Sequence, residues 1–277
     1  MRRNSCLLFS ASQRLCGESR PVEVGYNLGP VRLLVSLLTL SSLLMAQRTI
    51  LAIGAHAGDM EVTSAAVLAK HRKLGDRVVL LHLTLGEGGN PKISAQAYGE
   101  QKRREALAAA KVIGAEVLFG PYKDGEIPND EAARRYLADV IRQVKPTHIV
   151  THWRKSIHKD HSNTHAIVGD AILLASLESV VTGHPRHRGV RAVYYAENWE
   201  DAEDFKPYLY VDVSDELAQW KECVTHYQFV KGGVSSFPYL EYYEALARLR
   251  GAEAGKRYAV SFEVEPLAKK RVLDSLP

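Results

Sequence analysis

Hydrophobic and polar positions form blocks from Arg48 onward that predict strands and helices in turn. Apolar runs predict four strands, at 48–55, 77–84, 115–120 and 147–153. Helical spacing of apolar residues predicts four helices, at 61–75, 97–114, 129–145 and 161–180. Strict alternation of the two predicts an α/β, Rossmann-like fold, in which a mostly parallel sheet carries helices on both faces.

Local signals place the ends of these helices. Gly75 and Gly114 follow the last apolar positions of two of them and are expected to end them. Asn129 precedes the third helix and is expected to be its N-cap, while Pro146 lies just beyond its end. The pattern therefore predicts element boundaries as well as element types.

Residues 1–46 lack this alternation and form a predicted leader, followed by a single domain at 47–277. Arg32 precedes an apolar run at 33–46, which is shorter than the roughly 20 residues of a bilayer span. This pattern favours a signal peptide and an exported protein, periplasmic or extracellular. Leu44 lies where a cleavage site favours a small residue, so a retained segment and a cytoplasmic protein stay open. A stable membrane span is not expected.

Composition narrows the function classes. The chain has 277 residues, 46% hydrophobic and 25% charged, with a formal net charge of +4. Its basic residues are scattered and often adjoin acidic ones, as in EQKRREALAAAK at 100–111, which is typical of a solvated helix face and not of a nucleic-acid interface. Cys6, Cys16 and Cys223 support neither a disulfide framework nor a thiolate metal site.

Two polar clusters follow predicted strands. His56, Asp59 and Glu61 come after the first strand, and HKDH at 158–161 follows the fourth. The carboxyl ends of parallel strands meet at one edge of a sheet, where ligands bind in this architecture. A single loop histidine is usually solvated, and a single aspartate is usually a helix cap. Together, the side chains of His56, Asp59 and His161 suit a divalent metal and leave positions for water and substrate.

At these motifs the sequence resembles the LmbE/PIG-L family of zinc-dependent N-deacetylases (GlcNAc-PI de-N-acetylase-like). AHAGDME at 55–61 and HKDH at 158–161 match its two motifs, and LTLGEGG, KRREALAAAKVIGAE and RLRGAEAGKRYAVSF match further segments in order. The resemblance implies Zn²⁺ held by His56, Asp59 and His161, although the same set also suits Fe²⁺. It further implies that His158 stabilises an oxyanion or protonates the leaving amine, and that Asp160 orients a histidine.

The chain departs from the family at position 58. Gly58 stands where the family has the aspartate that activates water. Glu61, Glu87 and Asp160 are the candidate replacements within these motifs, and the sequence does not rank them. His158, Asp160 and Glu61 are the residues expected to have catalytic roles. An aspartate at position 58 is predicted to raise activity, unless the turn needs a glycine because φ is positive.

These features predict a metal-dependent N-deacetylase that acts on an N-acylated amino sugar or sugar conjugate, with altered catalysis. The alternative is a catalytically silent module of the same fold that binds a metal or a carbohydrate. A nucleotide-binding α/β protein is a weaker alternative because G-x-G-x-x-G is absent. The exact substrate, the native metal, the true start of the chain and the oligomeric state stay open.

Overall fold

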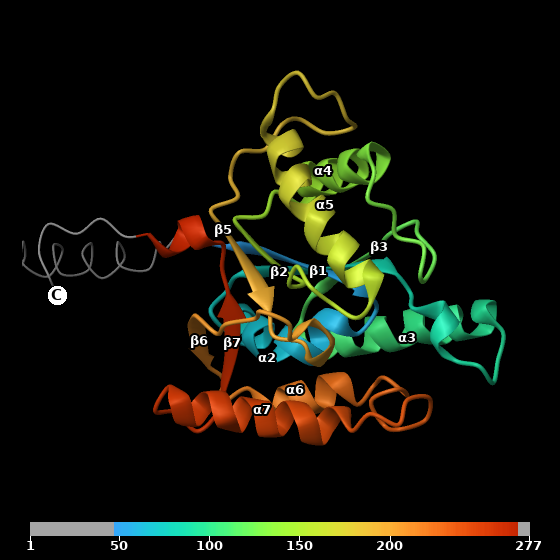
Figure 1. Cartoon of the computed structure of the whole chain (residues 1–277), viewed down its shortest axis with the longest axis vertical. Coiled ribbons are helices and arrows are strands. Elements are labelled where there is room, and N and C mark those ends of the chain that lie inside the picture. The colour runs from blue at the N-terminus through green and yellow to red at the C-terminus, as the bar shows by residue number, and fades with distance from the viewer. Residues whose placement is uncertain (1–46, 271–277) are drawn as a thin grey trace, which may run out of the picture. The chain divides into compact units, whose positions relative to one another are not determined.

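The structure, a computed structural model, describes residues 47–270 (Figure 1). The predicted leader and signal-like run therefore lie outside the described residues. Within 47–270, no helix is both long and apolar enough to cross a bilayer.

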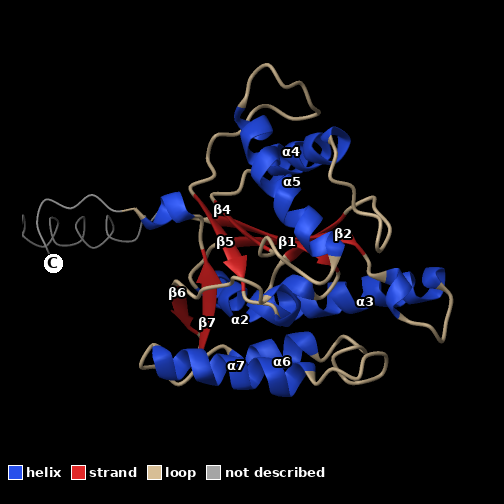
Figure 2. Ribbon diagram, viewed as in Figure 1, coloured by secondary structure: helices blue, strands red, loops and turns tan. Residues whose placement is uncertain are grey.

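A seven-stranded sheet with the order β3-β2-β1-β4-β5-β7-β6 forms the centre of the domain (Figures 1 and 2). The first five strands pair in parallel, and β7 pairs antiparallel with both β5 and β6. This confirms the predicted α/β fold with a mostly parallel sheet. The strands are β1 Thr49–His56, β2 Arg77–Thr84, β3 Glu116–Phe119, β4 His148–Thr151, β5 Ala192–Ala196, β6 Leu209–Asp212 and β7 Ala259–Glu263.

Helices cover both faces of the sheet. One apolar core lies beneath α4 and α5, and a second lies beneath the other four helices, as Figure 2 shows. A parallel sheet buried on both faces explains why β1 and β2 are almost continuously apolar. The helices are α2 Asp59–Lys73, α3 Ala95–Ile113, α4 Glu131–Val144, α5 Lys159–Ser176, α6 Leu217–Val224 and α7 Tyr239–Glu253.

Helix ends differ from the prediction at the N-cap of α4 and at the end of α5, which is Ser176 and not residue 180. The N-cap of α4 is Asp130, whose carboxylate accepts a hydrogen bond from the Ala133 amide, so the assignment to Asn129 is wrong. Asn129 instead accepts a hydrogen bond from the side chain of Arg134. Gly114 does end α3, with a φ of 70°.

The last third of the fold was not predicted. The strands β5, β6 and β7 have four or five residues each, and the strict alternation of strands and helices that supported the equally short β3 and β4 does not continue through them. These strands extend the sheet beyond β4, and the loop after β5 adds acidic residues to the same edge as β1 and β4.

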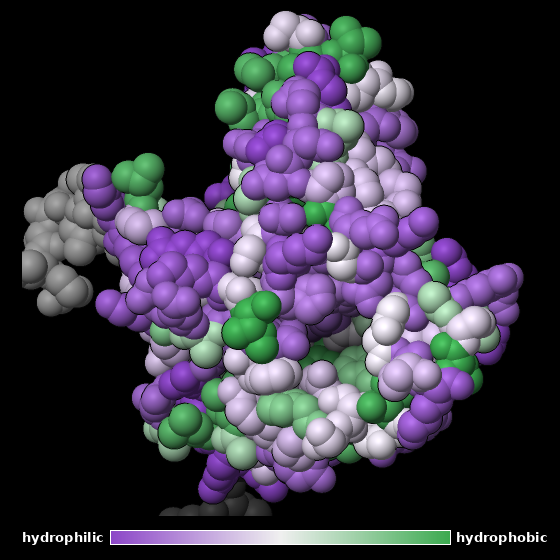
Figure 3. Space-filling model, turned by 45° about the vertical axis from the view of Figure 1, so that its right-hand side comes forward, coloured by the Kyte–Doolittle hydropathy of each residue, from purple (hydrophilic) through white to green (hydrophobic). Residues whose placement is uncertain are grey.

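The surface has one apolar region distant from that edge. Figure 3 shows a mostly hydrophilic face, with hydrophobic residues gathered at the upper end over the end of α5 and the loop that follows. Leu173, Leu177 and Val181 are exposed in this part of the chain. Because α5 has 18 residues, its two ends lie about 27 Å apart, so this region is far from His158 and His161 at the start of the helix.

Candidate metal centre and active site

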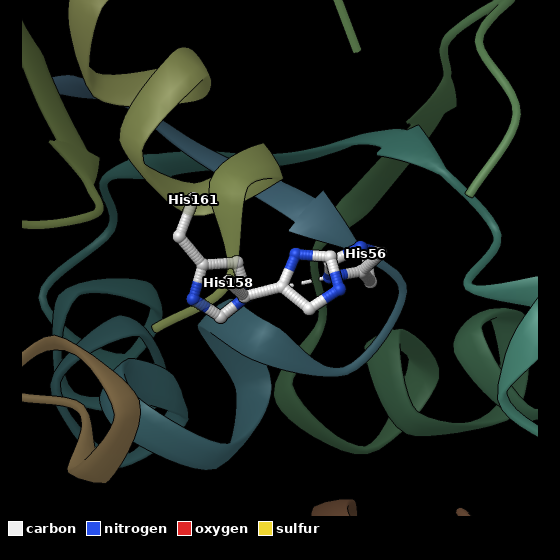
Figure 4. Close-up of side chains that lie close together, drawn as sticks. All are labelled: His56, His158 and His161. Atoms are coloured by element: carbon white, nitrogen blue, oxygen red, sulfur yellow. Dashed lines mark hydrogen bonds between the residues drawn. The ribbon is translucent and has the colours of Figure 1, made fainter. Parts of the chain in front are cut away.

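Three of the predicted ligands meet at the carboxyl edge of the sheet. The Asp59 Oδ2 atom lies 3.3 Å from His56 Nδ1 and 3.5 Å from His161 Nε2. The two imidazole nitrogens are themselves 3.3 Å apart. Figure 4 shows the side chains of His56, His158 and His161 gathered near the end of β1 and the start of α5.

The size of this triangle fits a small divalent cation. Ligand bonds of about 2.0–2.1 Å at tetrahedral angles place the ligand atoms about 3.4 Å apart. The three measured separations are 3.3, 3.3 and 3.5 Å. One carboxylate and two imidazoles also form a borderline donor set that suits zinc or ferrous iron. These three residues could therefore hold a metal and leave at least one coordination position free.

A buried carboxylate fixes the orientation of His161. Asp201 Oδ1 lies 2.9 Å from His161 Nδ1, which places the imidazole proton on that nitrogen and leaves the Nε2 lone pair facing His56 and Asp59. Burial lowers the pKa of His161 to about 4, so the ring stays neutral as a ligand must. Burial works to raise the pKa of Asp201, but hydrogen bonds from His152 and His161 outweigh it and lower this pKa to about 2.

His56 is surrounded by carboxylates on both sides of its ring. Its Nε2 atom lies 3.1 Å from Asp124 Oδ1 and 3.5 Å from Asp160 Oδ2, while Nδ1 faces Asp59. Burial lowers the pKa of His56, but the charge of Asp59 and the contacts with Asp124 and Asp160 together raise it well above its usual value. This excess of negative charge favours a cation here.

His152 completes the cluster but is poorly placed to bind metal. Its Nε2 accepts a hydrogen bond from the Ala55 amide at 3.0 Å, and its Nδ1 lies 3.0 Å from Asp201 Oδ2. Its ring stacks on His161 with 3.9 Å between centroids. Because the Nε2 lone pair is already used, we assign His152 a positioning role between Asp201 and the end of β1.

His158 presents a hydrogen-bond donor to the pocket. It is the N-cap of α5, and its Nδ1 accepts a hydrogen bond from the Asp160 amide at 3.2 Å. A neutral ring with Nδ1 as acceptor carries its proton on Nε2. Burial lowers the pKa of His158, and the positive charge of His56 lowers it further. The neutral ring can therefore donate to an oxygen that gains negative charge.

The candidate bases are distributed differently from the prediction. Glu61 is fully buried beneath the site, where it accepts a hydrogen bond from Tyr227 Oη at 2.6 Å and lies 3.3 Å from His82, so it does not face the pocket. Glu87 accepts a hydrogen bond from the Asp124 amide. Asp160 contacts His56 and accepts a hydrogen bond from the Gly125 amide, while Asp201 is the residue that orients His161.

Gly58 adopts a conformation that favours glycine. Its φ is +108°, and a Cβ atom built there would lie 2.8 Å from the ring of Phe229. The sequence predicts that an aspartate here raises activity unless the turn needs a glycine. The positive φ meets that condition. The glycine is therefore matched both to its turn and to its aromatic neighbour.

An open cavity of about 180 Å³ gives access to these residues. Besides the predicted ligands, Glu200 and Lys102 line it, although the sequence analysis singled out neither. Glu200 follows β5, and it also lines a smaller adjoining pocket beside Gly58. Burial raises the pKa of Glu200 to about 7, and the negative charges of Asp59 and Asp201 act in the same direction. A carboxyl group with this pKa can accept a proton near neutral pH.

The acidic residues after β5 left a recognisable signal that the sequence analysis did not use. Glu200 and Asp201 follow an apolar run, as Asp59 does after β1. Lys102 gave no such signal. The basic residues of its helix were interpreted as solvated, which holds for Arg103 and Arg104 but is wrong for Lys102, which is 4% exposed.

Comparison with known sequences matches this site to a family. Residues 51–172 match the model described as PIG-L: GlcNAc-PI de-N-acetylase. A 4-oxalmesaconate hydratase of Pseudomonas putida is 25% identical over 224 residues, which cover 78% of this chain and 84% of the relative. A 1D-myo-inositol 2-acetamido-2-deoxy-alpha-D-glucopyranoside deacetylase of Thermomonospora curvata is 31% identical over 170 residues, or 50% of this chain and 57% of that relative.

Solved structures share the fold with this chain. GalB, the 4-carboxy-2-hydroxymuconate hydratase of Pseudomonas putida, has a TM-score of 0.73 at 22% identity and covers 83% of this chain and 100% of its own. The N,N'-diacetylchitobiose deacetylase of Pyrococcus horikoshii has a TM-score of 0.69 at 17% identity and covers 85% of this chain and 92% of its own. The same fold therefore occurs in a hydratase and in a deacetylase.

Proposed function

The chain belongs to the PIG-L (LmbE) family through residues 51–172, and on that premise we propose that it is a metal-dependent hydrolase of N-acyl amides. The observation that carries this proposal is the triangle of His56 Nδ1, Asp59 Oδ2 and His161 Nε2, with sides of 3.3–3.5 Å. A divalent metal bound there would polarise the amide carbonyl and lower the pKa of water.

The residues around the triangle supply the remaining roles. His158 donates from Nε2 to the oxygen that becomes negative as the amide carbonyl is attacked. Glu200 takes the proton from the attacking water and is the replacement that we propose for the carboxylate absent at Gly58. Asp201 and His152 keep His161 in the orientation that directs Nε2 toward the other two ligands.

The family's substrates suggest where to look for the amide. The deacetylase relatives act on N-acetylated amino-sugar conjugates, as their names state. We extend this to the present chain as an N-acylated amino sugar or related small conjugate. Aromatic side chains of Tyr98, Phe229 and Tyr239 line the cavity and could pack against a ring.

The test combines metal content with turnover. The purified full-length chain, loaded in turn with Zn²⁺ and Fe²⁺, is assayed for amine release from a panel of N-acetylated sugars. The proposal expects release that stops on chelation and returns with metal. Metal binding without release from any amide in the panel would favour the silent binding module instead.

Hydration of a double bond is the second candidate function. The length over which a hydratase matches this chain favours it. The Pseudomonas putida hydratase is matched over 84% of its length, whereas the Thermomonospora curvata deacetylase is matched over 57%. A hydratase adds water across a double bond and releases no amine. The same metal-loaded protein is therefore incubated with 4-oxalmesaconate, and loss of the conjugated absorbance without amine release would identify this reaction.

A further inference from the structure

Lys102 is a buried cation in the wall of the candidate active site. It belongs to α3, is 4% exposed, and lines the same cavity as His56, Asp59 and His161. Burial lowers the pKa of its amine to about 8, so the amine remains mostly protonated at pH 7. A charged group in such a place is costly unless it is paired.

The contacts of the Lys102 amine with the protein are one hydrogen bond and two aromatic rings, without an ion pair among the described residues. The Lys102 amine donates to the Ala57 carbonyl and lies 4.2 Å from the centroid of the Phe229 ring and 4.9 Å from that of Tyr227. Within residues 47–270, no carboxylate oxygen lies within 4.0 Å of it. Glu105, three positions further along α3, accepts hydrogen bonds from Gln101 and from the Gln228 amide. Two of the three amine protons are therefore left for a ligand.

The Lys102 amine lies close to the two loops that surround the candidate ligands. A Cβ atom built on Gly58 would lie 3.6 Å from Lys102 Nζ, and one built on Gly86 would lie 3.7 Å from Lys102 Cε and 3.3 Å from His56 Cβ. Lys102 thus borders both loops that approach the ligand triangle. A small molecule that reaches the triangle can place a second group on the amine.

We propose that Lys102 binds a carboxylate of the substrate, so that the enzyme selects small acids over neutral analogues. The proposal rests on the function proposed above, since it takes the same cavity as the substrate site. A singly charged carboxylate matches one ammonium group. A doubly charged phosphate would leave one charge unmatched near Asp59, Asp124 and Glu200, which line the same cavity.

The experiment measures binding directly and does not depend on turnover. Succinamate, which carries one carboxylate, its neutral amide succinamide and inorganic phosphate are titrated calorimetrically into the full-length chain, both metal-loaded and after chelation, because a bound metal can itself bind carboxylates. The Lys102→Met variant keeps the length and apolarity of the stem and removes the charge. Lys231→Met, at an exposed lysine just after Phe229, is the matched control.

The proposal expects the unmodified chain to bind succinamate about 10- to 100-fold more tightly than succinamide, and Lys102→Met to lose this preference. Lys231→Met should keep it. Equal affinities for succinamate and succinamide in the unmodified chain would overturn the proposal, whatever the variants show. A preference for succinamate that survives Lys102→Met, or phosphate binding that is tighter and depends on Lys102, would also overturn it. Metal content and amine release are recorded separately, so a failure of the proposed function does not decide this result.

Discussion

The ring of Phe229 fills the space that a side chain at position 58 would need. A Cβ atom on Gly58 would lie 2.8 Å from both Cε1 and Cζ of that ring, and Gly58 has a φ of +108°. The ring in turn lies against the Lys102 amine. In this chain an aromatic ring and an ammonium group therefore occupy the space beside Gly58.

We expect Gly58→Asp alone to give no gain in activity. The new side chain collides with Phe229 and strains the backbone, which should lower the free energy of unfolding by about 1–3 kcal/mol. Phe229→Ala relieves only the collision. A double-mutant cycle of unfolding free energies should therefore show favourable coupling between the two substitutions. Additive effects, or a Gly58→Asp protein as stable as the unmodified chain, would show that the Phe229 ring does not restrict position 58.

Much of the fold could be predicted because its signals are local. The strands β1 and β2 are eight residues long and almost continuously apolar, so the apolar runs and the glycines near them are enough to identify them. The strands β5 to β7 are short, and β7 joins the sheet between two strands that precede it in the chain. That pairing depends on contacts distant in sequence, which no local pattern encodes.

The residues of the site also fall into two groups, those that short motifs reveal and those that only the folded chain brings together. His56, Asp59 and His161 were recognised from short motifs, and the structure brings their ligand atoms together. Glu61 belongs to the same motif, yet the helical turn that begins at Asp59 directs its side chain to Tyr227, which is 166 positions away. Asp201 and Lys102 reach the site only through tertiary packing, so their roles had to come from the structure.

Removal of His161 should sharply lower metal content with little change in folding. We expect the His161→Ala protein to retain less than about a tenth of the metal bound by the unmodified chain, because it loses one ligand of three. His184→Ala, at a partly exposed histidine in the loop after α5, is the control. Elemental analysis after dialysis gives the metal content, and circular dichroism checks folding. Full occupancy in His161→Ala would disprove the ligand assignment.

Asp201→Asn tests the orientation of His161 without removing a ligand. The amide cannot accept hydrogen bonds from two imidazole Nδ1–H groups as the carboxylate does. We expect metal affinity to fall by about 10- to 100-fold. Competition with a chromophoric chelator measures this affinity. An unchanged dissociation constant would mean that Asp201 does not orient His161.

Glu200→Gln should lower kcat by about 10² to 10⁴ while metal content stays the same. The carboxyl must be deprotonated to act as a base, and its pKa is raised to about 7. The rate of the metal-loaded enzyme should accordingly rise with pH along an acidic limb, which the bound cation moves below 7 because its positive charge favours the carboxylate. The variant should lack this limb. The kcat profile is measured from pH 5 to 9, and a limb that persists in Glu200→Gln would assign the base to another residue.

Lys102→Met should stabilise the protein at neutral pH, since it removes a buried charge without a carboxylate partner. The folded-state pKa of Lys102 is about 8, below its ordinary 10.5, so the destabilisation is fully present below pH 8 and is relieved as pH rises toward 10.5. This difference in pKa corresponds to at most about 3 kcal/mol, less the hydrogen bond to Ala57. Denaturant unfolding at pH 7 and at pH 10 should therefore show a stability gain at pH 7 that shrinks at pH 10. Lys231→Met should show neither effect, because an exposed ammonium group remains hydrated in both states. A gain for Lys102→Met that is the same at both pH values would mean that apolar packing, and not the buried charge, is responsible.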